Sequence, residues 1–212
     1  MTATIASTST ISTIRRQGFG ALVVLNEDVI KAGKGFGMHG HKDMEIVTIV
    51  LSGELTHEDS MGNKGTISEY NVQRMSAGTG VRHSETNNGK KPVHLLQIWI
   101  TPERKGISPS YEQHAFKCAL NEFTLIASYV KDPTAVYLHQ DATMHLGKFK
   151  PGAATAFTAD PDKGAYVFVI HGELSVEGKN VKAGDALAIT EAQHIRMQAM
   201  TESDVLVIQV PV

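Results

Sequence analysis

The sequence predicts an all-β protein made of two barrels of one design, and three observations support this prediction. Short β-prone runs, such as residues 45–51 and 94–100, are separated by turn residues, and helical periodicity is scarce. The second half of the chain repeats the pattern of the first. His39 and His41, separated by one residue, lie just before one of the β-prone runs, and the second half lacks this pair.

Size and composition are those of a globular protein without nucleic-acid or membrane partners. The 212 residues are 42% hydrophobic, which is enough for substantial cores, and a formal net charge of −2 gives no basic field for phosphate contacts. The apolar runs are much shorter than a bilayer requires. Cys118 is the only cysteine, which excludes an intrachain disulfide and a thiolate zinc cluster and favours a reducing compartment. We expect a monomer in the cytoplasm.

The first sixteen residues are rich in Ser and Thr, lack acidic residues and end in Arg15-Arg16. This composition superficially resembles an organelle transit peptide. We favour a β-like or frayed start, because the segment shows no clear amphipathic helix and has few basic residues. Residues 18–30 then predict a strand over 21–25 that ends in a turn at 26–28.

Three glycines at positions 33, 35 and 37 crowd the approach to His39, as suits a strand that enters a tightly curved barrel. The residue types then delimit a series of strands and turns. We expect strands at residues 45–51, 54–58, 66–75 and 94–100, a break at 52–53, a hairpin turn at 60–65 and a loop with two prolines at 102–111.

Two residue pairs predict a metal site in the first half. His39 and His41 are two positions apart, and so are His83 and Glu85. Side chains alternate faces along an extended chain, so each pair shares one face and can converge on one ion. Three imidazoles and a carboxylate in this arrangement are difficult to explain as packing, so we predict a four-ligand metal site. These donors suit iron, nickel, copper, zinc or manganese. Iron(II) is favoured, because histidines and a carboxylate that leave positions open are a typical iron(II) ligand set.

The second half preserves the strands of the first and loses these ligands. Residues 49–55, with Gly53, recur as residues 168–174, with Gly172, an offset of 119 residues. His194 corresponds to His83 at an offset of 111, so the second copy has a turn shorter by eight residues. At these offsets Thr158, Asp160 and Arg196 replace His39, His41 and Glu85. We predict a metal-binding domain over residues 1–131 and a domain without a metal site over 132–212.

Several other residues are set aside from the site. A single histidine on a strand is more often a satisfied polar residue than a ligand, and seven histidines fall under this interpretation: His57, His94, His114, His139, His145, His171 and His194. Met44, Met75 and Trp99 are interpreted as core residues, and Glu45 as a structural residue or one that contacts a ligand.

Four motifs together resemble those of the pirin family within the cupin superfamily. They are Gly-Phe-Gly-Met-His-Gly-His-Lys-Asp-Met-Glu at 35–45, Leu-Thr-His-Glu-Asp-Ser-Met-Gly-Asn at 55–63, Met-Ser-Ala-Gly-Thr-Gly-Val-Arg-His-Ser-Glu at 75–85 and Gln-Ile-Trp-Ile at 97–100. Bacterial pirin-like quercetin 2,3-dioxygenases are especially similar. The resemblance implies two tandem cupin jelly-roll barrels, with one metal, usually iron, held in the first by His39, His41, His83 and Glu85. Gly40 departs from the proline that this motif usually has, and the N-terminus also differs.

The resemblance leaves two functions from different classes. The first is a dioxygenase that cleaves a flavonol such as quercetin with release of carbon monoxide, for which the partners are a small aromatic substrate and dioxygen. Glu85 is then the catalytic base that accepts the substrate's 3-hydroxyl proton. The second is a regulator or stress protein without turnover, which binds a partner protein according to the oxidation state of its iron. An open pocket at the metal favours the enzyme, and a large exposed patch on the first barrel favours the regulator.

Overall fold

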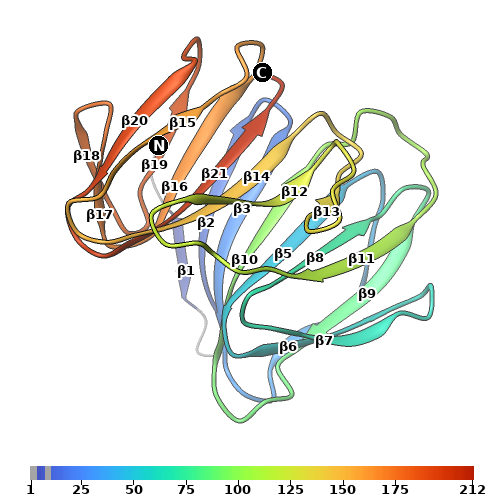
Figure 1. Ribbon diagram of the computed structural model, residues 1–212. Coiled ribbons are helices and arrows are strands. Elements are labelled where there is room, and N and C mark those ends of the chain that lie inside the picture. Colours follow the sequence, from blue (N-terminus) through green and yellow to red (C-terminus); the bar gives the residue numbers. More distant parts are fainter. Residues whose placement is uncertain (1–3, 8–10) are drawn as a thin grey trace.

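The computed structural model describes residues 4–7 and 11–212, and its regular elements over these residues are all β-strands (Figure 1). The described residues form 21 strands in four sheets. Among them, no helix has the length and apolar character needed to cross a membrane. The prediction of an all-β protein is confirmed.

Two sheets belong to the first half of the chain. The larger has the order β1-β2-β3-β10-β5-β8-β11, with bounds Thr4–Ser7, Ile11–Phe19, Leu22–Ile30, Val93–Ile100, Glu45–Ser52, Asn71–Ser76 and Ser110–Ala115. The smaller has the order β4-β9-β6-β7, with bounds Gly35–His41, Val81–Thr86, Glu54–Asp59 and Lys64–Ser68.

Two further sheets are formed by the second half. The larger has the order β13-β12-β14-β21-β16-β19, with bounds Val136–Tyr137, Phe123–Ser128, Thr143–Phe149, Ser203–Val210, Gly164–His171 and Ala186–Ile189. The smaller has the order β15-β20-β17-β18, with bounds Ala154–Thr158, His194–Ala199, Glu173–Val176 and Lys179–Lys182. The two small sheets lie at opposite sides of the molecule (Figure 1).

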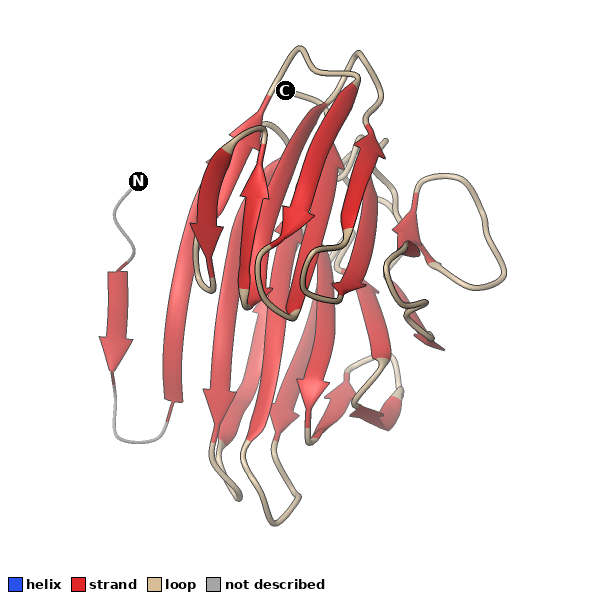
Figure 2. Cartoon of the chain, turned by 60° about the vertical axis from the view of Figure 1, so that its left-hand side comes forward, coloured by secondary structure: helices blue, strands red, loops and turns tan. Residues whose placement is uncertain are grey.

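The two large sheets pack against each other in the middle of the molecule. Their long strands run side by side in Figure 2, and one apolar core joins residues of both halves, including Val47 and Leu96 from the first and Phe168 and Leu206 from the second. A second core fills the C-terminal barrel. The first barrel contains two smaller apolar clusters instead.

The internal repeat predicted from the sequence is present in the structure. β5 and β16 have the same length at the predicted offset of 119 residues. Gly53 and Gly172 follow them with φ values of 82° and 81°, a backbone conformation that favours glycine. A Cβ atom at either position would meet the backbone carbonyl of the adjoining segment. Both barrels therefore require glycine at this position, after Ser52 in the first and after His171 in the second.

Three local expectations are corrected. The turn expected at residues 26–28 lies inside β3, because the polar side chains of Asn26 and Asp28 are buried in the barrel rather than solvated at its edge. The single strand expected at 66–75 is interrupted by a turn in which Tyr70 has a φ of 61°. The loop expected at 102–111 ends where β11 begins at Ser110, which pairs with Ser76.

Two further expectations concern the division between the two barrels and the structure near the N-terminus. The predicted division at 131/132 places β12 in the first domain, whereas β12 pairs with β14 in the second large sheet. We therefore propose a boundary within residues 116–122. Of residues 1–16, expected to be β-like, 4–7 form β1 and 11–16 lie in β2. Residues 1–3 and 8–10 lie outside the described residues.

Candidate metal centre

Three of the predicted ligands gather between two neighbouring strands of the small N-terminal sheet. β4 carries His39 and His41, and β9 carries His83 directly opposite His39. The ring centroids lie 4.5 Å apart for His39 and His83, 5.0 Å for His41 and His83, and 4.8 Å for His39 and His41. One ring nitrogen from each histidine lies within 4.8 Å of the other two. The arrangement is compact enough for one cation to reach all three imidazoles.

The environment of His83 fits a metal ion. Its side chain is 1% exposed, and neither ring nitrogen has a hydrogen-bond partner among the described residues. A buried polar atom without a partner costs free energy, so two such atoms on one ring indicate an unseen partner. Burial lowers the pKa of His83 to about 3 and that of His41 to about 4, and neighbouring histidines add to both shifts. Neutral imidazole is the form that binds a metal.

Glu85 is more deeply buried than His39 and His41. It is fully buried, its Oε2 accepts a hydrogen bond from Gln97 Nε2 at 2.7 Å, and its Oε1 accepts one from Thr48 Oγ1 at 3.3 Å. Burial raises the pKa of Glu85 to about 7 against the opposite effect of these two hydrogen bonds. Its carboxylate falls in a second group, in which ligand atoms of His57, His83 and Glu85 lie within 4.8 Å of one another. The four predicted ligands therefore do not form a single group, since Glu85 groups with His83 and His57 and not with His39 and His41.

His57 is the residue that the sequence analysis missed. It was set aside as an ordinary strand histidine, and the structure places it in the barrel interior, opposite Glu85, with 0% exposure. Its Nε2 lies 3.3 Å from Asp59 Oδ2 and its Nδ1 lies 3.4 Å from Gln73 Nε2. The one available signal was its spacing to Asp59, since two polar residues at i and i+2 on a strand share a face. Burial lowers the pKa of His57, and Asp59 opposes the shift.

These residues belong to a polar layer, which we define as the buried side chains of Thr48, His57, Gln73, Glu85 and Gln97. The layer separates the two small apolar clusters of the first barrel. In the second barrel, the repeat replaces Thr48 and His57 by Val167 and Val176, and Val207 pairs with Val167 as Gln97 pairs with Thr48. All three valines lie in its continuous core. His194, expected at the place of His83, is exposed, while its neighbour Ile195 is buried. Groups able to hold a metal occur only in the first barrel within the described chain.

Other residues noted in the sequence support the site from outside it. Trp99, expected in the core, donates from Nε1 to Gln97 Oε1 at 3.1 Å, and its ring lies 5.1 Å from that of His41. Glu45 is buried, and its Oε2 accepts hydrogen bonds from Ser76 Oγ and His139 N. Glu45 therefore links the first barrel to the loop between β13 and β14 of the second. Met75 lies in the apolar core, as expected.

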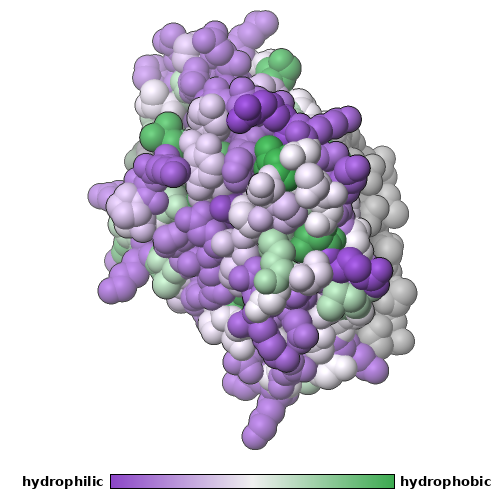
Figure 3. Space-filling model, turned by 90° about the vertical axis from the view of Figure 1, so that its right-hand side faces the viewer, coloured by the Kyte–Doolittle hydropathy of each residue, from purple (hydrophilic) through white to green (hydrophobic). Residues whose placement is uncertain are grey.

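The His41 side of the site opens toward the surface. A hollow of about 390 Å³ lies beside His41, and Lys42, Ser60 and Arg82 contribute to its lining. The face of the molecule on the right of Figure 1 is mainly hydrophilic, with hydrophobic residues in small separate groups (Figure 3). Over the described residues drawn in Figure 3, this face shows no broad apolar patch of the kind that marks protein partners.

Comparison with known proteins places the chain in one family. Residues 7–100 match the Pirin family model, and residues 125–210 match the Quercetinase C-terminal cupin domain. A relative from Escherichia coli K12 named quercetin 2,3-dioxygenase is 40% identical over 195 residues, which cover 92% of this chain and 84% of the relative. A putative quercetin 2,3-dioxygenase from Pseudomonas aeruginosa is 36% identical over 198 residues, 92% of this chain and 85% of the relative.

Solved structures agree with this assignment. The crystal structure of YhhW from Escherichia coli matches with a TM-score of 0.94 at 36% identity, covering 99% of this chain and 95% of YhhW. The bacterial pirin YhhW in complex with nickel(II) matches with a TM-score of 0.92 at 35% identity and the same coverage. The family resemblance and the two-barrel cupin fold predicted from the motifs are confirmed. The chain therefore belongs to the pirin family, as a bicupin of the quercetin 2,3-dioxygenase-like type.

Proposed function

We propose that this chain is a metal-dependent dioxygenase that cleaves a flavonol such as quercetin and releases carbon monoxide. The observation that carries the proposal is His83, a buried imidazole with two unpartnered nitrogens beside His39 and His41. A cation at this place would satisfy one of these two nitrogens and would explain why a neutral imidazole is buried there. The relatives named quercetin 2,3-dioxygenase supply the substrate class.

His39, His41, His83 and Glu85 would hold one divalent cation. Iron(II) is our first choice, and the donor set also suits copper, nickel, manganese and zinc. A crystal structure of YhhW contains nickel(II), which supports binding of metals other than iron by this fold. When bound, the metal supplies a Lewis acid that stabilises the substrate's enolate and an open position for dioxygen chemistry.

Glu85 has the proton-transfer role in this proposal. One carboxylate oxygen accepts the proton of the flavonol 3-hydroxyl, as a general base. Gln97 Nε2 and Thr48 Oγ1 hold the carboxylate in place from neighbouring strands. The apolar clusters on either side of the polar layer keep bulk water from this carboxylate. In this proposal the substrate approaches the metal from the surface hollow that His41 lines.

The decisive experiment is turnover of quercetin by iron-loaded protein in the presence of oxygen. We expect repeated consumption of the flavonol's visible absorbance together with release of carbon monoxide. Both signals should disappear in metal-free protein and in the His39→Ala, His41→Ala double variant. Metal-bound protein that consumes no quercetin with iron, copper, nickel or manganese would refute flavonol cleavage.

A further inference from the structure

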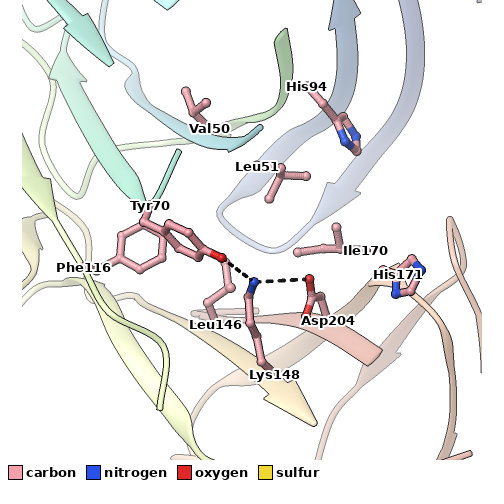
Figure 4. A pocket seen from close by; sticks show the side chains of 10 residues that line it. All are labelled: Val50, Leu51, Tyr70, His94, Phe116, Leu146, Lys148, Ile170, His171 and Asp204. Atoms are coloured by element: carbon pink, nitrogen blue, oxygen red, sulfur yellow. Dashed lines mark hydrogen bonds and ion pairs between the residues drawn. The ribbon is translucent and has the colours of Figure 1, made fainter. Parts of the chain in front are cut away.

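A second pocket lies between the two barrels, away from the metal centre. It has a volume of about 230 Å³ and ten lining residues, five from each barrel (Figure 4): Val50, Leu51, Tyr70, His94, Phe116, Leu146, Lys148, Ile170, His171 and Asp204. The two barrels contribute equivalent residues to the pocket, since Leu51 corresponds to Ile170 in the repeat. Interfaces between domains are common positions for small-molecule sites.

The walls of this pocket are apolar and its polar groups converge at one place. Leu146 and Ile170 are buried, with 3% and 8% exposure. Lys148 Nζ donates to Tyr70 Oη at 3.1 Å and lies 3.8 Å from Asp204 Oδ2 (Figure 4). The same ammonium lies 4.7 Å from the centre of the Tyr70 ring. Tyr70 comes from the first barrel, whereas Lys148 and Asp204 come from adjacent strands of the second.

The backbone of Tyr70 is strained at the place where its side chain contacts Lys148. Its φ of 61° is in the left-handed region, which a bulky side chain rarely adopts. Its carbonyl accepts a hydrogen bond from Phe116 N at 2.9 Å, which ties the turn to another wall of the pocket. Strained backbone of this kind persists where the surrounding structure enforces it and is concentrated at ligand sites.

The charge and the size of the pocket restrict the ligand. Lys148 is balanced by Asp204, so the site offers no excess positive charge for a full anion. A group that both accepts from an ammonium and donates to a carboxylate matches the pair, and a hydroxyl does both. The volume is below the range of about 300–1,000 Å³ that is typical of drug-sized sites, so it fits one substituted ring and not a three-ring flavonol.

We propose that the pocket between the barrels is a binding site for a small monocyclic phenol. The aromatic ring lies against Leu146, Ile170 and Phe116, the phenolic oxygen accepts a hydrogen bond from Lys148, and the hydroxyl donates to Asp204. The site is separate from the metal centre and does not depend on flavonol cleavage. Val50 and Leu51, in its wall, belong to the same strand as Thr48, which contacts Glu85.

Titration calorimetry of the metal-loaded protein with phenol tests this proposal. We expect saturable binding at one site per chain, with a Kd on the order of 1 mM, as is usual for so small a ligand. Toluene, which lacks the hydroxyl, and benzoate, which is a full anion, should each bind at least about fivefold more weakly. Equal binding of toluene, tighter binding of benzoate or no saturable binding of phenol would overturn the proposal.

Variants locate the site. Lys148→Met keeps the length of the side chain and removes the ammonium, and we expect it to weaken phenol binding about tenfold. Lys150→Met changes an exposed lysine on the same segment and should bind phenol as the parent does. The His39→Ala, His41→Ala variant should also retain phenol binding. Loss of binding in this double variant, or parental affinity in Lys148→Met, would place the phenol elsewhere and refute the site.

A pocket-filling variant protects the test against a folding defect. Ile170→Phe places a larger side chain in the wall of the pocket and should abolish phenol binding. Circular dichroism checks that each variant is folded, and retained metal content is a second check for the Lys148, Lys150 and Ile170 variants, whose metal ligands are intact. Undiminished binding in a folded Ile170→Phe protein would contradict the proposal independently of Lys148.

Discussion

At the scale of single residues, the site depends on groups that have been removed from water. His83 and Glu85 share one buried face of β9, and their cross-strand neighbours on β6 are Asp59 and His57. Burial separates these groups from bulk water, so each needs a partner within the barrel. Glu85 has two such partners and His83 has none among the described side chains. For the proposed function, this difference supports the histidines as the principal metal ligands and the carboxylate as the base.

Glu85→Gln separates these two roles. The amide still offers one oxygen to the metal but is a far poorer base, so we expect the metal content to be retained at least in part. Turnover of quercetin should fall by about two to four orders of magnitude, the usual contribution of a general base. Parallel measurement of metal content and steady-state rate checks this expectation. A variant that turns over at the parental rate would remove Glu85 as the base.

His145 makes the stability of the second barrel depend on pH. Burial lowers its pKa from 6.5 to about 4, and its ring contacts Phe157 at 5.0 Å. Between these two values the unfolded chain binds a proton that the folded chain does not, so stability is fully present above pH 6.5 and declines as the pH falls toward 4. We expect this histidine to account for a loss of about 2 kcal/mol between pH 7.5 and pH 5.

The measurement is urea unfolding of metal-free protein at both pH values. Other buried histidines titrate in the parent as well, so the diagnostic quantity is the change in pH dependence caused by His145→Leu. The variant should lose about 2 kcal/mol less than the parent over this interval. His194→Leu, which alters an exposed histidine of the same barrel, should keep the parental pH dependence. Identical pH dependence in His145→Leu and the parent would contradict the assignment.

At the scale of elements, β4 lies at the edge of its sheet and carries two of the ligands. Gly40, between them, is not in the left-handed region, and a Cβ atom there would make only ordinary contacts with Arg82 and Val81. Proline is tolerated on edge strands and reduces the freedom of the unfolded chain. We therefore expect Gly40→Pro to bind metal at least as tightly as the parent, as measured by competition with a chelator. A large loss of metal affinity would show that Gly40 uses a conformation closed to proline.

The glycine after β16 gives a second prediction for an element. Gly172→Ala combines a left-handed backbone with a clash against Glu202 O, so we expect a loss of about 3 kcal/mol in the free energy of unfolding. Gly178→Ala is the matched control. Gly178 has a similar φ of 76° but open space around it, so only the backbone term of about 1 kcal/mol remains. Denaturant unfolding compares the two, and equal losses would exclude the close approach as a cause.

At the scale of the whole molecule, two similar barrels have different interiors. The first has the polar layer beside the histidines of the metal centre, and the second has valines at three of the equivalent positions. We expect about one tightly bound metal per chain, which elemental analysis of purified protein measures. The His39→Ala, His41→Ala variant should lose it. Two tight sites in the parent, or near-stoichiometric metal in the double variant, would contradict a single site in the first barrel.

The sequence by itself determined the features that follow from local patterning. Alternating apolar residues and turn residues specify strands, the offset of 119 residues between Gly53 and Gly172 reveals the repeat, and the i, i+2 spacing of His39 and His41 puts both imidazoles on one face. Each of these depends only on residues close together in the chain or on comparing the chain with itself. The two-barrel arrangement was within reach for that reason, and the family was within reach through the resemblance of four short motifs.

Only the tertiary structure decided which polar residues are buried together. Asn26 and Asp28 have the composition of a turn but lie within β3, because Gln97 and Leu95 of β10 pair with them. His57 enters the interior beside Glu85 because β6 and β9 are neighbours, although the two residues are 28 positions apart. Lys148 reaches Tyr70 across the two barrels. Burial and pairing between distant strands determine the environment of these groups, and residue types alone predict neither.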